Sequence, residues 1–183
     1  PTLFFYPKNC LNNREDATSA DLEKHLVPIG KSRTVRSGKD ITFVGYGNTV
    51  ALSLKAAAAL DASGVSSEVI DLRHLVPWDV DAVLASAEKT GRVIVSHEDN
   101  DTAGYGAEVV ATIAERASRP VMLRRVSRPD TFVPCHFGSQ LAVLPSYQRI
   151  LETAVDMLGG SISWDAPVEA TQGEYLIPAI GSS

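Results

Sequence analysis

Cysteine is scarce in this sequence, and its scarcity excludes two kinds of small protein. The 183 residues contain two cysteines, Cys10 and Cys135. Two thiols are too few for a disulfide framework and too few for a four-thiolate zinc site. The sequence is therefore typical of a protein from a reducing compartment, and we expect a cytoplasmic location.

An excess of positive charge is also missing, and so are long apolar runs. Lysine and arginine together number 17 against 22 aspartates and glutamates, which gives a formal net charge of −5. Such a chain has no overall positive field to hold a nucleic-acid backbone or an anionic membrane surface. No apolar run approaches the ~20 residues that cross a bilayer. We therefore expect neither nucleic acid nor a membrane among its partners.

From residue 41 onward the sequence contains a regular alternation of strand-like and helix-like segments. Short apolar runs typical of strands occur at 41–46, 68–71, 92–96 and 121–126, and helical spacing occurs at 48–63, 79–90, 105–117 and 147–158. Strands that alternate with helices favour a mainly parallel sheet covered on both faces. The predicted fold class is α/β, with three layers.

The segments on either side of this alternation differ from it in composition. The chain begins with Pro1 rather than Met, the run Leu3–Tyr6 resembles a strand, and residues 30–40 are basic. We interpret residues 1–40 as the tail of a preceding domain and a connecting arm, within a longer polypeptide. Residues 41–158 form the domain itself, and residues 159–183, which lack periodicity, form a C-terminal extension.

Gly45-Tyr46-Gly47 lies between a strand and a helix, as the glycines of a dinucleotide-binding turn do, and the same tripeptide recurs at 104–106. Asp71 ends the next strand, near the position expected for a ribose-binding acid. The third glycine of that fingerprint is replaced by Val50. We favour a tight turn capped by Asn48, and we keep a stand-alone, Rossmann-like nucleotide-binding module as an alternative.

His97 and Glu98 close the third strand of the alternation. The carboxyl ends of parallel strands form the crevice in which ligands bind, so His97, Glu98 and Asp71 could face it together. A histidine beside a carboxylate can transfer protons, although structural hydrogen bonds are the interpretation we favour. The four histidines are widely scattered, which argues against a zinc site.

Arginines cluster around the fourth strand, where alternation places Arg124 and Arg125 on opposite faces. We interpret this cluster as a charged rim or an interface. An anion site is the less favoured interpretation.

Four short motifs then follow one another along the chain. They are Glu68-Val-Ile-Asp-Leu-Arg73 with Pro77, Lys89-Thr-Gly-Arg92 leading into His97-Glu98, Gly104-Tyr-Gly-Ala-Glu108, and Arg128-Pro-Asp-Thr131 with Pro134. In this order they resemble the C-terminal transketolase-like domain of the beta subunit, or of a fused alpha–beta chain, of thiamine diphosphate-dependent 2-oxo acid dehydrogenases. The resemblance runs from about Pro28 to Leu158. The segments 77–81 and 96–98 are more similar to the branched-chain enzymes than to the pyruvate enzymes.

The resemblance implies an oxidative decarboxylation of a 2-oxo acid, after which the acyl group passes to a lipoyl-bearing acyltransferase. It implies thiamine diphosphate and magnesium in the complete enzyme, held by other domains, so we expect this chain alone to bind neither and to be inactive. The implied partners are an alpha subunit or alpha-like domain, a second beta-like copy and the lipoyl-acyltransferase core.

The resemblance assigns no catalytic residue to this chain. It implies an indirect or interface role for five residues, which are His97, Glu98, Asp71, Glu108 and Asp130. The enzymatic alternative is the equivalent domain of a transketolase or a deoxyxylulose phosphate synthase, in which an arginine would hold a sugar phosphate.

Overall fold

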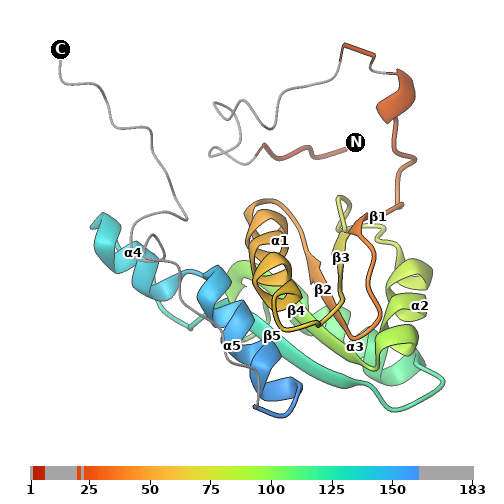
Figure 1. Ribbon diagram of the computed structural model, residues 1–183. Helices are drawn as coiled ribbons and strands as arrows, with labels where there is room; N and C mark the ends of the chain where they lie inside the picture. The colour runs from red at the N-terminus through yellow and green to blue at the C-terminus, as the bar shows by residue number, and fades with distance from the viewer. Residues whose placement is uncertain (1, 7–19, 22, 161–183) are drawn as a thin grey trace.

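The computed structural model describes residues 2–6, 20–21 and 23–160 (Figure 1). The elements follow one another as η3 (Glu23–His25), β1 (Arg33–Arg36), β2 (Ile41–Gly45), α1 (Asn48–Asp61), β3 (Ser67–Asp71), α2 (Val80–Thr90), β4 (Arg92–Asn100), α3 (Tyr105–Arg116), β5 (Met122–Arg128), α4 (Phe137–Val143) and α5 (Tyr147–Met157). None of the helices in the described residues is long and apolar enough to cross a membrane.

The five strands form one sheet in the order β1-β3-β2-β4-β5. The pairs β3–β2, β2–β4 and β4–β5 are parallel, and β1 lies antiparallel to β3 at the edge. All five residues of the central strand β2 are buried. A strand covered on both faces has a nearly continuous run of apolar, β-branched residues. This pattern predicted β2.

Helices cover both faces of the sheet, as Figure 1 shows. On one face α1 and α5 pack over Phe43, Val69 and Ile94, and three alanine side chains of α1 and α5 are buried there. On the other face α2 and α3 pack over Val44, Ile70 and Val95. The prediction of a three-layer α/β fold with a mainly parallel sheet is confirmed.

Two segments before the alternation differ from their predicted structure. The basic stretch 30–40, interpreted as a connecting arm, contains β1, which joins the sheet. Its side chains are mostly polar, so the apolar pattern does not reveal it, and the strand is held by backbone pairing and by Arg36, which donates to the Ser67 carbonyl oxygen at 3.1 Å. The described residues 2–6 form no strand, and their apolar side chains are exposed.

The short helix α4 was not predicted. His136 stands at its N-cap and accepts a hydrogen bond from the Ser139 amide. The predicted C-terminal extension lies almost entirely outside the described residues, because the structure describes the chain only to residue 160. The proposed division into residues 1–40, 41–158 and 159–183 stays a prediction.

A buried polar cluster closes the sheet near the amino ends of the strands. Glu68 is 5% exposed and accepts hydrogen bonds from the side chains of Ser86 and Lys89 and from the Gly38 amide. Burial by itself raises the pKa of Glu68, but these hydrogen bonds and the Lys89 charge outweigh it and lower the pKa. A Cβ at Gly38 would lie 2.1 Å from the Ser67 carbonyl carbon, so only glycine fits beside this cluster.

The packing of α5 predicts a clear difference between two neighbouring substitutions. Leu151 is fully buried between α5 and the sheet, whereas Glu152 is exposed on the same helix. Leu151→Ala should lower the free energy of unfolding by about 2–5 kcal/mol, because a buried side chain is replaced by a cavity. Glu152→Ala should change it by less than about 0.5 kcal/mol. Urea denaturation of both variants tests this, and equal effects would mean that α5 does not pack as described.

Candidate functional site

The carboxyl ends of β2 and β4 mark the point where the chain connections diverge. From β2 the chain passes through α1 to β3 on one side, while β4 lies on the other side of β2. In open α/β sheets, this switch point is where ligands usually bind. In this protein, side chains from the start of α1 span the switch point and contact β4. Thr49 Oγ1 lies 2.9 Å from the carbonyl oxygens of both Tyr46 and Ser96, and Asn48 Nδ2 donates to Glu98 Oε1 at 3.1 Å.

Asn48 does not cap α1 in the way that the sequence predicted. The N-cap is Gly47, which has a positive φ of 57°, and no side chain caps the helix. Asn48 is the first residue of α1, and its amide side chain reaches across to β4 because Glu98 lies there to accept it. The Glu98 carboxylate thus takes a place beside the start of α1 where a dinucleotide fold would hold a phosphate. This arrangement disfavours the nucleotide-binding alternative.

His97 is fully buried at the carboxyl end of β4. Its ring packs against two glycines that begin the next helix. A Cβ at Gly104 would lie 2.7 Å from His97 Cε1, and a Cβ at Gly106 would lie 2.3 Å from both Cδ2 and Nε2. Glycine at 106 is therefore required by the imidazole, and glycine at 104 is required first by the Asn100 carbonyl oxygen, 2.0 Å from such a Cβ, and also by the imidazole.

The ring nitrogens of His97 do not make the structural hydrogen bonds that we favoured. Neither nitrogen has a hydrogen-bond partner in the described part of the chain. Burial lowers the pKa of His97, and the Arg125 charge lowers it further, although Asp99 and Asp101 act in the opposite direction. The imidazole is held neutral and away from solvent, so it is a packing element of this edge and not an exposed proton carrier.

Glu98 belongs to the switch point, and the other three predicted residues lie around the same end of the sheet in separate local settings. Asp71, at the end of β3, is ion-paired with Arg73 at 3.5 Å, and burial raises the pKa of its carboxyl group. Glu108 is exposed in the first turn of α3. Asp130 follows β5 and accepts from the amide and hydroxyl of Thr102, which lower its pKa.

Two tyrosines form a contact that the sequence analysis missed. Tyr46 and Tyr105 are the central residues of the repeated Gly-Tyr-Gly, and their rings meet edge to face with centroids 6.1 Å apart. The Tyr105 hydroxyl donates to the Leu75 carbonyl oxygen. Burial raises the pKa of each tyrosine to about 12. The pair joins the end of β2, the start of α3 and the loop after β3 into one rigid unit, and the repeated tripeptide was the only signal for it.

Within the ranges that the structure describes, no three His, Cys, Asp or Glu side chains lie close enough to hold a metal ion. The exposed Cys135 lies in the loop between β5 and α4. At the switch point Asn48 and Thr49 contact Glu98 and main-chain carbonyl groups, whereas the Ser96 hydroxyl and the His97 ring nitrogens have no hydrogen-bond partner among the described residues.

The contact between His97 and Gly106 predicts a strong energetic coupling. Replacing a helix glycine by alanine normally stabilises a protein, by up to about 1 kcal/mol. Gly106→Ala should instead lower the free energy of unfolding by about 1–3 kcal/mol, because the new methyl group collides with the imidazole. In a His97→Ala background, Gly106→Ala should leave the free energy of unfolding nearly unchanged or should raise it. A double-mutant cycle by urea denaturation measures this coupling, and an equal cost in both backgrounds would contradict the packing.

The buried imidazole also predicts a pH dependence of stability. The folded pKa of His97 lies below its unfolded value of about 6.5, so the unfolded chain binds the proton more readily. The contribution of His97 is complete above about pH 6.5 and is lost progressively as the pH falls below that value. The free energy of unfolding at pH 5.5 relative to pH 7.5 should therefore decrease less in His97→Gln than in the parent chain. An identical decrease in both proteins would show that His97 is not buried in its neutral form.

One protein family and several known proteins are similar to this chain. The family described as "Transketolase, C-terminal domain" matches residues 30–148, a range that includes β1. The mitochondrial 2-oxoisovalerate dehydrogenase subunit beta of Dictyostelium discoideum is 41% identical over 140 residues, which are 75% of this chain and 37% of that protein. The pyruvate dehydrogenase E1 component subunit beta of Bacillus subtilis is 43% identical over 139 residues, which are 74% of this chain and 42% of that protein.

Among solved structures, a split gene transketolase in an inactive beta4 tetramer is similar, with a TM-score of 0.62 and 27% sequence identity. The similarity covers 72% of this chain and 42% of that one. This chain spans about two fifths of the length of the relatives that it matches. The chain belongs to the transketolase C-terminal domain family, and its relatives include the E1 beta subunits of pyruvate and branched-chain 2-oxo acid dehydrogenases.

Proposed function

We propose that this chain is the C-terminal assembly and partner-docking domain of the decarboxylating component of a 2-oxo acid dehydrogenase complex. The complete enzyme would decarboxylate a 2-oxo acid oxidatively and pass the acyl group to a lipoyl-acyltransferase. Thiamine diphosphate and magnesium would supply the covalent chemistry from other domains. The family membership and the names of the relatives support this assignment.

The observation that carries the proposal is the occupied switch point. Asn48 donates to Glu98 across it, the Thr49 hydroxyl lies within hydrogen-bonding distance of the Tyr46 carbonyl oxygen after β2 and of the Ser96 carbonyl oxygen in β4, and His97 fills the space under the start of α3. A diphosphate and a magnesium ion need phosphate-binding amides and oxygen ligands that converge on an open space. The described residues at this edge do not fit these groups. A positioning role for the edge is consistent with a domain whose cofactor lies elsewhere.

The exposed apolar side chains support contact with other polypeptides. The large exposed ones in the described residues lie in the N-terminal segments, on β5 and in loops. Val76 is 88% exposed in the loop after β3, and Phe132 is 94% exposed in the loop after β5. Both loops follow the carboxyl ends of parallel strands, so these side chains lie at the same end of the sheet. In a domain that assembles with other polypeptides, these side chains are candidates for the contact surface.

The finer parts of the proposal concern substrate, partners and location. We favour a branched-chain 2-oxo acid over pyruvate as the substrate, because the segments 77–81 and 96–98 are more similar to the branched-chain enzymes. The proposed partners are an alpha subunit or alpha-like domain, a second beta-like copy and the lipoyl-acyltransferase core, and the solved relative named as a beta4 tetramer supports assembly with further copies. The proposed location is the cytoplasm, because the scarcity of cysteine is typical of a reducing compartment. The Dictyostelium relative is named mitochondrial.

A second candidate is the equivalent domain of a transketolase. The similarity to a split gene transketolase favours it. The two candidates differ in their partners, because only the dehydrogenase delivers an acyl group to a lipoyl-bearing core. Retention of the full-length protein on an immobilised lipoyl-acyltransferase core would support the dehydrogenase, and failure to bind together with transketolase activity would support the second candidate.

The proposal predicts how the cofactor binds. Titration of this chain with thiamine diphosphate and magnesium should leave its tyrosine and tryptophan fluorescence unchanged, because the cofactor site belongs to other domains. The full-length polypeptide, assembled with its partners, should show saturable quenching under the same conditions. Magnesium without thiamine diphosphate is the control. Tight, saturable binding by this chain alone would reject the proposal.

A further inference from the structure

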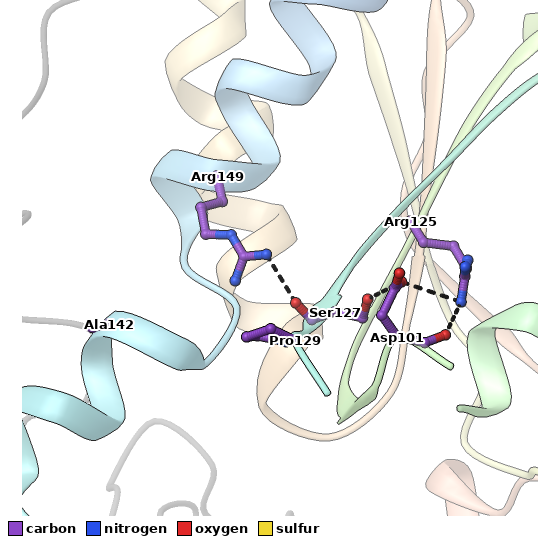
Figure 2. A pocket seen from close by; sticks show the side chains of 6 residues that line it. All are labelled: Asp101, Arg125, Ser127, Pro129, Ala142 and Arg149. Atoms are coloured by element: carbon purple, nitrogen blue, oxygen red, sulfur yellow. Dashed lines mark hydrogen bonds and ion pairs between the residues drawn. The ribbon is translucent and has the colours of Figure 1, made fainter. Parts of the chain in front are cut away.

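A hollow lies at the carboxyl end of the edge strand β5, beside the switch point but separate from it (Figure 2). Its volume is about 370 Å³, and six residues line it, which are Asp101, Arg125, Ser127, Pro129, Ala142 and Arg149. They come from the loop after β4, from β5 and the residue that follows it, and from α4 and α5. The volume lies at the lower end of the range for small-molecule sites, roughly 300–1,000 Å³. The hollow therefore has room for more than a single ion.

Arg149 brings a fixed positive charge to this hollow. Its Nη2 donates to the Ser127 carbonyl oxygen at 2.9 Å, and its Nη1 donates to the Leu144 carbonyl oxygen at 3.3 Å. Both acceptors are neutral main-chain groups. No carboxylate of the described residues forms an ion pair with Arg149. The guanidinium is thus oriented by the backbone, half-buried and not neutralised, and it keeps further N–H donors for a ligand.

The remaining charges of the hollow compensate each other. Arg125 lies 3.3 Å from Asp101 Oδ1, and the Ser127 hydroxyl donates to the same oxygen at 2.7 Å. Figure 2 shows these three side chains joined, with Arg149 on the opposite side of Ser127. The one acidic group of the lining is therefore engaged by Arg125. Two arginines against one aspartate leave the lining with a net charge of +1.

We propose that this hollow binds an oxyanion, as inorganic phosphate or as the phosphoryl group of a small phosphorylated molecule, with Arg149 as the principal contact. A guanidinium presents paired donors that match the oxygens of a phosphate. Because Arg149 is already held by two carbonyl groups, binding costs little loss of side-chain freedom. The space beside it accommodates the organic part of a phosphorylated molecule. This site is independent of the cofactor assignment, since no residue of the switch point lines it.

The test is an NMR titration of the ¹⁵N-labelled chain at constant pH and constant ionic strength. Sodium phosphate and ribose 5-phosphate are the two probes, and sodium chloride is the reference salt. We expect saturable shifts of the Ser127 and Arg149 amides with either probe. Equal affinities would assign the site to the free anion, and tighter binding of ribose 5-phosphate would assign it to a phosphorylated molecule. The absence of saturable shifts at these amides with both probes would overturn the proposal.

Three variants locate the binding in the hollow. Arg149→Gln should weaken phosphate binding at least tenfold. Asp101→Asn keeps an acceptor for Ser127 and Arg125 but removes the negative charge, so it should bind phosphate roughly fivefold more tightly. Because the second effect is a gain, a folding defect cannot imitate it. Unchanged or weaker binding by Asp101→Asn would contradict the proposal.

Arg119→Gln is the matched control. Arg119 also donates to one main-chain carbonyl group, that of Lys89 at 3.4 Å, but it precedes β5 at the opposite end of the strand. Its substitution should leave the affinity for phosphate unchanged. An equal loss in Arg119→Gln and Arg149→Gln would show that phosphate responds to the general charge of the surface and not to the hollow.

Discussion

The packing of the His97 imidazole against the backbone of Gly104 and Gly106 is the constraint on which the rest of this edge depends. The ring fills the space between the end of β4 and the start of α3, where even a methyl group on either glycine would collide with it. The loop from Asp101 to Ala103 must therefore leave β4 and return within a few residues, so that Gly104 lies against the Asn100 carbonyl oxygen. This sets the positions of Asp101 and Thr102, and through them the contacts with β5 and the segment after it.

The two ends of the sheet use polar groups in different ways. Near the amino ends, the buried Glu68 carboxylate is held by the exposed Lys89 and by the Ser86 hydroxyl, and this arrangement serves stability. At the carboxyl ends, polar groups pair across strands that are distant in sequence, while apolar side chains such as Phe132 remain exposed. An edge that is rigid beneath and apolar at its loops is suited to contact with other polypeptides, which is the role that the proposed assembly domain requires. The hollow at β5 adds a charged feature to the same end.

The sequence predicted the parts of the structure that depend on local patterns. The buried β-branched runs predicted β2 and β4, and the helical spacing at 147–158 predicted α5, because both patterns reflect which faces are buried. The helical spacing at 79–90 predicted α2, which ends at Gly91 with a positive φ of 70°. The edge strand β1 could not be predicted in this way, because its side chains are mostly polar and show no apolar pattern. The strand is held by backbone pairing, which does not require particular side chains.

The details of the candidate site depended on contacts between distant residues. Asn48 is a reasonable helix cap by its position, but its partner Glu98 lies 50 residues away. His97 was assigned to this edge from its place at the end of a strand, whereas its packing against Gly104 and Gly106 and its lack of hydrogen-bond partners in the described chain depend on the fold. Arg149 has no sequence signal at all, since the two carbonyl groups that orient it are brought together only by the fold.

The central claim is that the carboxyl edge of this domain contacts other polypeptides and does not hold the coenzyme. Hydrogen–deuterium exchange of the amides in residues 98–104 and 129–133 tests it most directly. The account predicts slower exchange in both segments when the complete protein assembles with its partner subunits, and unchanged exchange when thiamine diphosphate and magnesium are added to this chain alone. Protection of these segments in this chain by the coenzyme, with no partner present, would contradict it.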